Sequence, residues 1–194
     1  SPYNVAQEIY IDMIPVTDYI TSGVWQIILN PTRVVEGQYD LWLPSENVLN
    51  RGTGFLYPDE EVTLTIPSTA DKVISVGAYD ALTFSYASFS GRGYTWQDER
   101  TKPDLVAPGV NVRTTAVGGG VTVVSGTSFA TPFVTGASAL LMEWGIVRGN
   151  DPFLYGEKVK AYLRRGAREL PGFGKYPNRE VGYGRLCLSE SIPK

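Results

Sequence analysis

The chain has 194 residues, of which 43% are hydrophobic and 19% are charged, and its formal net charge is −3. This balance excludes a strongly basic nucleic-acid-binding protein and a polybasic membrane-surface protein. The longest apolar run, about 15 residues, is too short to cross a bilayer, so we expect a soluble globular protein with no membrane span. Cys187 is the one cysteine, which excludes an internal disulfide and hence a small disulfide-stapled domain.

The first third of the chain has the pattern of antiparallel β structure. Polar and apolar residues alternate over 8–14, and residues 23–29 are rich in β-branched and aromatic side chains. Residues 33–44 predict a strand, a turn and a second strand, and residues 62–66 predict a last strand. Short strands without helical periodicity predict a β-sandwich, or part of a jelly roll, over residues 1–66.

Several aromatic residues leave a second interpretation of this region open, in which they form stacking surfaces for a sugar or a protein partner. These residues are Trp25, Tyr39, Trp42 and Trp96. Aromatic side chains in strands more often belong to a core than to a ligand platform, so we favour a structural role for the predicted sandwich.

Short strands are predicted next at 72–78, 105–107 and 110–114. Asp80 follows the first of them and is expected to cap a turn, and Asp104 precedes the second and is expected to be structural. The triglycine at 118–120 is not a phosphate-binding loop, because no G-x-x-x-x-G-K-[ST] motif is present and a strand follows it. We expect it to link the two strands of a hairpin.

Residues 121–145 predict a buried strand over 121–124, a tight turn over 125–127, and a helix that begins at or beside Ser128. The first N–H groups of a helix lack intrahelical partners, and the helix dipole is positive there, so an oxyanion forming beside Ser128 would be stabilised. Pro132 is tolerated because it lies at the start of the helix. The helix is apolar on all sides, which predicts burial. A strand, a sharp turn, a serine and a buried helix together indicate a hydrolase nucleophile, and the plain alternative is a serine that only caps a core helix.

A second helix is predicted over 155–166, where apolar side chains recur at helical spacing and the basic ones are expected on the surface. Arg164, Arg165 and Arg168 leave an anionic partner open as an alternative, but they are expected to complement the negative end of that helix dipole. Residues 186–188 are expected to close the fold as a last strand or edge, with Cys187 as a core thiol.

The chain contains no histidine. A serine hydroxyl is a poor nucleophile until a base removes its proton, and that base is usually a histidine oriented by an acid. No Ser-His-Asp triad can therefore be complete within these residues. Lysine is the base in some serine hydrolases, but Lys102, Lys158 and Lys160 lie in segments predicted as a strand start or a helix surface, so a Ser-Lys dyad is not favoured.

Residues 126–136, GTSFATPFVTG, resemble the nucleophile motif of subtilisin-like serine proteases, G-T-S-x-A-x-P-x-V-x-G, at every fixed position. Other segments resemble the same family in the same order: PSTADKVISVGAYD (67–80), FSGRG (89–93), KPDLVAPGV (102–110) and GYGRL (182–186). A bare G-T-S would be a weak signal, whereas these ordered matches are specific. Residues 25–44 and 176–186 further resemble the clostridial Csp-type group, which has an inserted jelly-roll domain.

This resemblance implies an α/β fold. Residues 67–194 would be the carboxy-terminal part of a subtilisin-like parallel-sheet catalytic domain, preceded over 1–66 by part of an antiparallel β-sandwich or jelly roll. Ser128 would be the catalytic nucleophile, and its backbone N–H, with the Thr127 hydroxyl nearby, would form part of the oxyanion hole. The implied function is a serine endopeptidase that hydrolyses a protein or peptide substrate through an acyl-enzyme.

The base and its acid would come from elsewhere. The resemblance implies that the partner is the missing amino-terminal part of the same protein, which would carry the Asp, the His and the oxyanion-hole Asn. The chain is therefore expected to be a fragment that is inactive alone. No cofactor or metal is expected, although the resemblance raises a Ca²⁺ or weak monovalent cation near Asp80. Its location is expected to be exported or spore-associated in a bacterium.

The alternative function is a catalytically dead pseudoprotease, or a partner-binding module with a subtilisin fold. The intact motif around Ser128 argues against decay at this position. A lipase or esterase is excluded because the sequence has no G-x-S-x-G motif.

Overall fold

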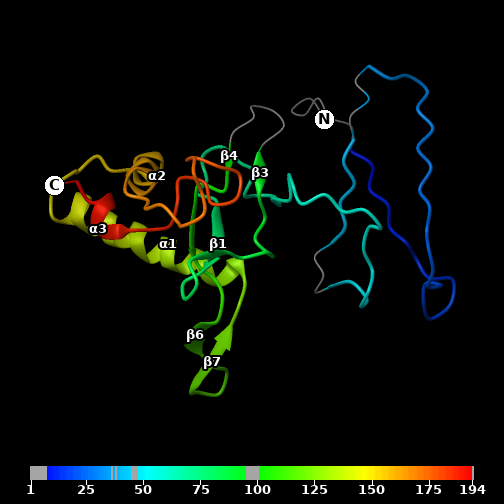
Figure 1. Ribbon diagram of the computed structural model, residues 1–194, viewed down its shortest axis with the longest axis horizontal. Helices are drawn as coiled ribbons and strands as arrows, with labels where there is room; N and C mark the ends of the chain where they lie inside the picture. Colours follow the sequence, from blue (N-terminus) through cyan, green and yellow to red (C-terminus); the bar gives the residue numbers. More distant parts are fainter. Residues whose placement is uncertain (1–7, 36, 38, 45–47, 95–100, 194) are drawn as a thin grey trace. The chain divides into compact units, whose positions relative to one another are not determined.

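The structure is a computed structural model that describes residues 8–193 apart from 36, 38, 45–47 and 95–100 (Figure 1). The chain divides into two compact units, Ser1–Thr53 and Gly54–Lys194. The second unit contains every α-helix and β-strand assigned to the described residues.

No strand is assigned to the described residues of the first unit, which run as extended chain and turns. Their large apolar side chains are exposed, Trp25, Tyr39 and Trp42 among them, whereas Trp96 lies outside the described residues. Residues 62–66, in the second unit, are also turn and coil. The predicted β-sandwich is therefore not confirmed. A strand needs a hydrogen-bonded neighbour, so an alternating sequence does not form one where no pairing partner is present.

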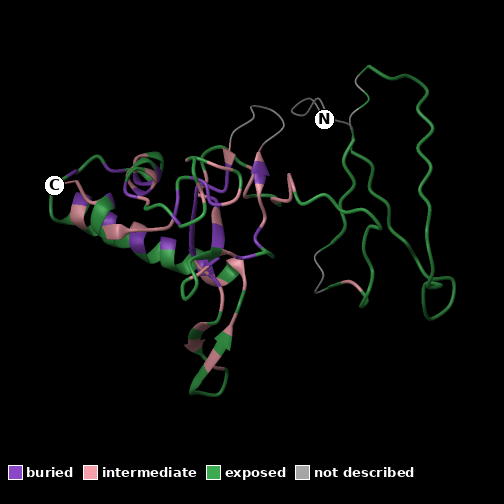
Figure 2. Ribbon diagram, viewed as in Figure 1, coloured by how far each residue is buried: buried purple, intermediate pink, exposed green. Residues whose placement is uncertain are grey.

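The centre of the second unit is a three-stranded sheet with the order β2-β1-β5. Strand β1 (Val76–Asp80) runs parallel to β5 (Leu105–Pro108), and β2 (Ser85–Tyr86) is antiparallel to β1 at the edge. The inner residues of β1 and β5 are buried (Figure 2), as expected for parallel strands covered on both faces. The predicted strands are confirmed, except that β1 begins four residues later than predicted.

Helix α1 (Thr127–Met142) packs against β1 and β5 and continues into the π-helical segment η2 (Glu143–Val147). Its buried residues lie on one stripe: Ala130, Val134, Ala137 and Leu141. Phe133, Leu140 and Met142 are exposed, so the predicted burial on all sides is wrong for this chain. Among the described helices, Thr127–Val147 alone is long and apolar enough to cross a membrane. This is weak evidence for a membrane span, because the buried residues of α1 belong to the hydrophobic core.

Strands β6 (Val112–Thr115) and β7 (Val121–Val124) form an antiparallel hairpin that projects from the sheet (Figure 1). The triglycine link predicted at 118–120 forms the tip, where the Ala116 N–H donates to the Gly120 carbonyl at 3.1 Å. The prediction that β7 is buried is wrong, because its residues alternate between exposed and half-buried. A projecting two-stranded hairpin has only one face that can pack against the body. A second, smaller antiparallel pair consists of β3 (Gly93–Tyr94) and β4 (Thr101–Lys102).

The predicted second helix is confirmed as α2 (Gly156–Arg165), which packs against α3 (Leu188–Ser191) and α1. Lys160 was expected on the surface of α2, but it is buried. The predicted closing strand at 186–188 is also wrong. Isolated bridges join Arg185 to Val106 and to Arg168, and α3 begins two residues after Leu186. Cys187 is half-buried, with its Sγ 3.4 Å from the Ser189 Oγ, so the prediction of a core thiol holds only in part.

Candidate active site

Ser128 is the second residue of α1, and its side chain is exposed. The turn before it passes through Gly126, whose φ of 150° and ψ of 156° place it in a region that only glycine adopts readily. Thr127 is half-buried between these two residues. This backbone path presents the serine at the start of a helix whose buried stripe, from Ala130 to Leu141, packs in the core.

The turn around Gly126 is attached to the sheet through the turn that follows β5. The Gly126 N–H donates to the Gly109 carbonyl at 2.8 Å, and the Gly109 N–H donates to the Tyr79 carbonyl at 3.0 Å. A Cβ at position 109 would lie 2.6 Å from the Ala78 Cβ and 3.0 Å from the Gly126 carbonyl oxygen. Glycine at 109 is thus what allows the turn before Ser128 to approach β1 so closely.

A side chain joins the same two turns. The Asn111 backbone N–H donates to the Ser125 Oγ at 2.9 Å. This bond could not be predicted from the sequence, which indicates only a serine in a turn, because Asn111 and Ser125 are 14 residues apart and meet only when β6 and β7 pair.

The start of α1 presents a positive electrostatic environment to Ser128. The Phe129 N–H is satisfied by the Gly126 carbonyl at 3.1 Å, whereas among the described residues neither the Ser128 N–H nor the Thr127 hydroxyl has a recorded partner. Pro132 has no N–H, so the Ser128 carbonyl receives no hydrogen bond from it. An unpaired N–H at the positive end of a helix dipole is suited to receive a developing oxyanion. Thr127 and Ser128, the two residues predicted for the site, are adjacent in the sequence and are the first two residues of α1.

No base contacts Ser128 within the described part of the chain, and all three candidate lysines are engaged elsewhere. The Lys158 Nζ lies 2.7 Å from the Asp151 Oδ1, and the Lys160 Nζ donates to the Asp71 and Val73 carbonyls at 2.8 Å each. The Lys102 Nζ donates to the Ala70 carbonyl at 3.2 Å and to the Ser75 Oγ at 3.0 Å. The structure therefore gives no support to a Ser-Lys dyad.

Asp104 is fully buried and structural, as predicted. Its carboxylate accepts the Ser75 N–H at 2.7 Å and lies 3.3 Å from both the Lys102 Nζ and the Lys160 Nζ. Arg164 completes the cluster with its Nε 3.1 Å from Oδ1. Burial lowers the pKa of Lys160 to about 8, against the opposing attraction of Asp104. Sequence reasoning assigned Arg164 to the helix dipole and missed this cluster, because its members come from three separate segments.

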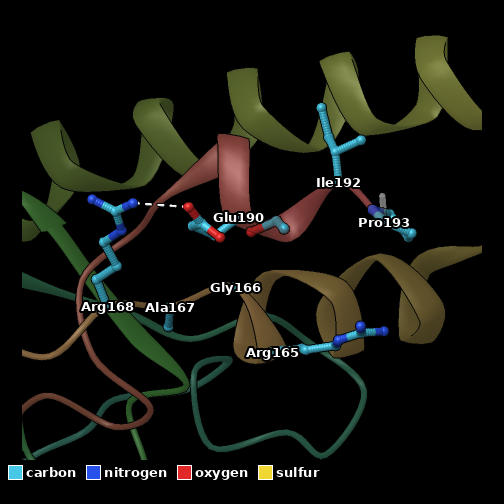
Figure 3. A pocket seen from close by; sticks show the side chains of 8 residues that line it. Arg165, Gly166, Ala167, Arg168, Glu190, Ile192 and Pro193 are labelled. Atoms are coloured by element: carbon cyan, nitrogen blue, oxygen red, sulfur yellow. Dashed lines mark hydrogen bonds and ion pairs between the residues drawn. The ribbon is translucent and has the colours of Figure 1, made fainter.

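Hollows among the described residues of the second unit include the following two. One, of about 280 Å³, adjoins the residue after the nucleophile and is lined by Phe129, Pro132 and Phe133 of α1 and by Val112, Arg113 and Thr114 of β6. The other, of about 500 Å³, lies between the end of α2 and α3, where the Arg168 Nη2 donates to the Glu190 Oε1 at 2.8 Å (Figure 3). Neither hollow is lined by Ser128 or Thr127, but the first is lined by Phe129, the residue next to Ser128, and so lies beside the candidate site.

Asp80 caps a turn, as predicted, because its Oδ1 accepts the Leu82 N–H at 2.8 Å. Within the described ranges, no three His, Cys, Asp or Glu side chains come together as a metal site. One carboxylate that already serves a turn does not provide the oxygen ligands that a hard cation requires. The cation near Asp80 therefore stays a prediction without an identified ligand set.

The chain is similar to several known proteins. The sequence model of the Subtilase family, Peptidase_S8, matches residues 56–184. The chain is 39% identical over 131 residues to the membrane-bound transcription factor site-1 protease of Mus musculus, a match that covers 65% of this chain and 12% of that protein. It is 34% identical over 156 residues to the serine protease AprX of Bacillus subtilis (strain 168), which covers 70% of this chain and 33% of that protein.

Solved structures are also similar to this chain. The Clostridium perfringens CspB protease is 50% identical, with a TM-score of 0.70 and coverage of 74% of this chain and 30% of that chain. The self-cleaved protease domain of PatA is 32% identical, with a TM-score of 0.51 and coverage of 65% of this chain and 42% of that chain. The chain therefore spans less than half of the length of each of these relatives.

Proposed function

The chain belongs to the subtilase family, and from this premise we propose that it supplies the nucleophile of a serine endopeptidase, with Ser128 as that nucleophile. The observation that carries the proposal is the exposed Ser128 at the start of α1, after the turn at Gly126. The N-cap of α1 is Gly126, so Ser128, the second residue of the helix, does not occupy the capping position.

In the proposed reaction, the Ser128 Oγ attacks the carbonyl carbon of the scissile peptide bond. The carbonyl oxygen becomes an oxyanion, which accepts a hydrogen bond from the Ser128 backbone N–H, with the Thr127 hydroxyl as a nearby donor. Collapse of this intermediate expels the amine and leaves an acyl-enzyme on Ser128, which water then hydrolyses. The substrate is thus a protein or peptide.

The proton of Ser128 must go to a base, and none is recorded beside it in the described residues. We infer that the base is a histidine, oriented by an aspartate, from a complementary amino-terminal portion of the same protein, which would also carry the oxyanion-hole asparagine. Two observations support this inference: the chain has no histidine, and it spans only 12% to 33% of the curated relatives compared above.

A fluorophosphonate probe tests the proposal, because it labels only an activated serine. Here the native protein means the 194-residue chain together with the portion that carries the histidine. We expect this native protein to be labelled at Ser128, as located by peptide mass spectrometry. The 194-residue chain alone should remain unlabelled. Ser128→Ala should abolish the label. Ser138→Ala should retain it, because the Ser138 hydroxyl donates to the Val134 carbonyl within α1 and lies away from the turn.

Each result has a clear meaning. Labelling of the isolated chain would overturn the inference that the base comes from another portion. A native protein that carries the histidine portion and yet remains unlabelled would contradict the endopeptidase proposal and favour a pseudoprotease with a subtilisin fold.

A further inference from the structure

The chain leaves the β6–β7 hairpin and enters the nucleophile turn within a few residues. The last backbone-paired residues of the hairpin are Val112 and Val124. The next pair toward the nucleophile would be Asn111 and Ser125, and here the ladder is replaced by one bond from the Asn111 N–H to the Ser125 Oγ. The Ser125 side chain therefore replaces a backbone acceptor at the point where the strand ends and the turn begins.

Two bonds now hold the turn before Ser128. The first, from the Gly126 N–H to the Gly109 carbonyl at 2.8 Å, involves backbone atoms only. This bond attaches one point of the turn to the turn that follows β5. The Asn111–Ser125 bond provides a second point, one residue before Gly126 and two residues after Gly109, and so helps to orient the turn that presents Ser128.

The backbone of Asn111 has a φ of 52°, a left-handed conformation that asparagine tolerates better than most residues. This conformation determines where the Asn111 N–H points. Asn111 and Ser125 are both exposed, so solvent can replace their hydrogen bond at little cost to folding. A bond of this kind affects the geometry of the turn more than the stability of the fold.

We propose that Ser125 is a positioning residue for the nucleophile, which acts by accepting the Asn111 N–H and thereby orienting the turn that carries Ser128. This inference rests on the proposed function, and it adds a residue that is not part of the nucleophile motif. Small displacements of a reacting group can cost up to about 100-fold in rate, so loss of the second attachment point should be visible in the acylation step.

The test compares Ser125→Ala and Ser125→Thr in the native protein, with Ser138→Ala as the matched control that loses a hydroxyl elsewhere in the same segment. Ser125→Ala should lower the rate of fluorophosphonate labelling and kcat by about tenfold, with KM unchanged within about twofold. Ser125→Thr keeps the acceptor oxygen and should recover most of the rate. Ser138→Ala should react at the native rate.

Equal labelling rates for the native protein and Ser125→Ala would overturn the proposal. The proposal would also be overturned if the fall in the labelling rate of Ser125→Ala matched its loss of folded protein, measured by thermal unfolding, and Ser125→Thr did not restore the rate. A native protein that is not labelled at all refutes the proposed function separately. In that case hydrogen exchange still tests whether the Asn111–Ser125 bond holds the turn. The Asn111 amide should exchange faster in Ser125→Ala than in the native protein. Unchanged exchange would show that the bond does not hold the turn.

Discussion

Arg164 and Asp104 are 60 residues apart in the sequence, yet the Arg164 Nε lies 3.1 Å from the Asp104 Oδ1. The pair joins the last turn of α2 to the residue before β5, and Lys102 and Lys160 approach the same carboxylate. One buried carboxylate is thus shared by three cations. The residues of β5 lead directly into the turn at Gly109, which holds the turn before Ser128. The Asp104 cluster therefore anchors the strand that supports the candidate site.

Asp104→Asn should destabilise the fold strongly. The amide keeps the shape of the side chain but removes the only charge in the cluster that balances the three cations. Loss of one member of a buried ion pair typically costs about 3–5 kcal/mol of unfolding free energy. Denaturant unfolding of the native protein and the variant measures this cost.

Asp59→Asn is the matched control for Asp104→Asn, since it removes the same charge from an exposed side chain whose Oδ1 accepts the Glu61 N–H at 2.9 Å. The asparagine keeps that acceptor, so the change should stay within about 0.5 kcal/mol. Equal effects of the two substitutions would contradict the structural role of Asp104.

Lys160 predicts a dependence of stability on pH. Its pKa is lowered by burial to about 8 in the folded protein, against 10.5 for the ordinary side chain. Between these values the unfolded chain binds more protons than the folded one, so the free energy of unfolding rises with pH in this window. From about pH 7 to about pH 9.5, the native protein should gain about 2 kcal/mol relative to Lys160→Met, which has no such group.

The measurement for Lys160 is denaturant unfolding of the native protein and Lys160→Met at each pH, so that all other titrating groups cancel in the comparison. Parallel pH profiles of the two proteins would show that Lys160 does not titrate in this range. A native profile that falls with pH relative to the variant would mean that attraction to Asp104 outweighs burial.

Gly109→Ala should disturb the nucleophile turn. The added methyl group would lie 2.6 Å from the Ala78 Cβ and 3.0 Å from the Gly126 carbonyl oxygen, so β1 and the turn would have to separate. Overpacking of this kind costs about 1–3 kcal/mol, and we expect the labelling rate of Ser128 to fall along with the unfolding free energy.

Gly136→Ala provides the comparison for Gly109→Ala. A Cβ at position 136 has nothing within 4 Å and would extend a regular helix, so the substitution should stabilise the protein by about 0.5–1 kcal/mol. A harmless Gly109→Ala would show that the two turns are not as closely packed as described.

Tyr176→Phe should destabilise the loop that follows α2. The Tyr176 hydroxyl accepts the Leu170 N–H at 2.8 Å and donates to the Leu170 carbonyl at 2.9 Å. Its removal leaves both backbone groups unpaired in a half-buried place, at a cost of about 1–3 kcal/mol. Thermal or denaturant unfolding measures the loss.

Tyr183→Phe removes a hydroxyl that has no recorded partner among the described residues, while its ring remains beneath the Arg164 guanidinium at 4.9 Å. This variant should stay within about 0.5 kcal/mol of the native protein. If both tyrosine variants behaved alike, the two hydrogen bonds to Leu170 would not contribute to stability.

The sequence by itself determined the elements whose signals are local. The apolar runs at β1 and β5, the glycines of the hairpin tip, the helical spacing of α2 and the order of strand, turn and serine before α1 all predicted what the structure contains. Each of these features depends on hydrogen bonds and side-chain spacings within a few residues, which a linear sequence records directly.

Only the tertiary structure decided which distant residues meet. The Asp104 cluster unites side chains from the start of β5, from α2 and from the loop before β1, and the Ser125 bond requires that β6 and β7 pair. The same dependence on pairing explains why the alternating pattern before residue 67 did not yield strands, and why α1 is buried on one stripe only. Burial and pairing are properties of the surfaces that come together, so they are fixed by packing and not by the local pattern of residues.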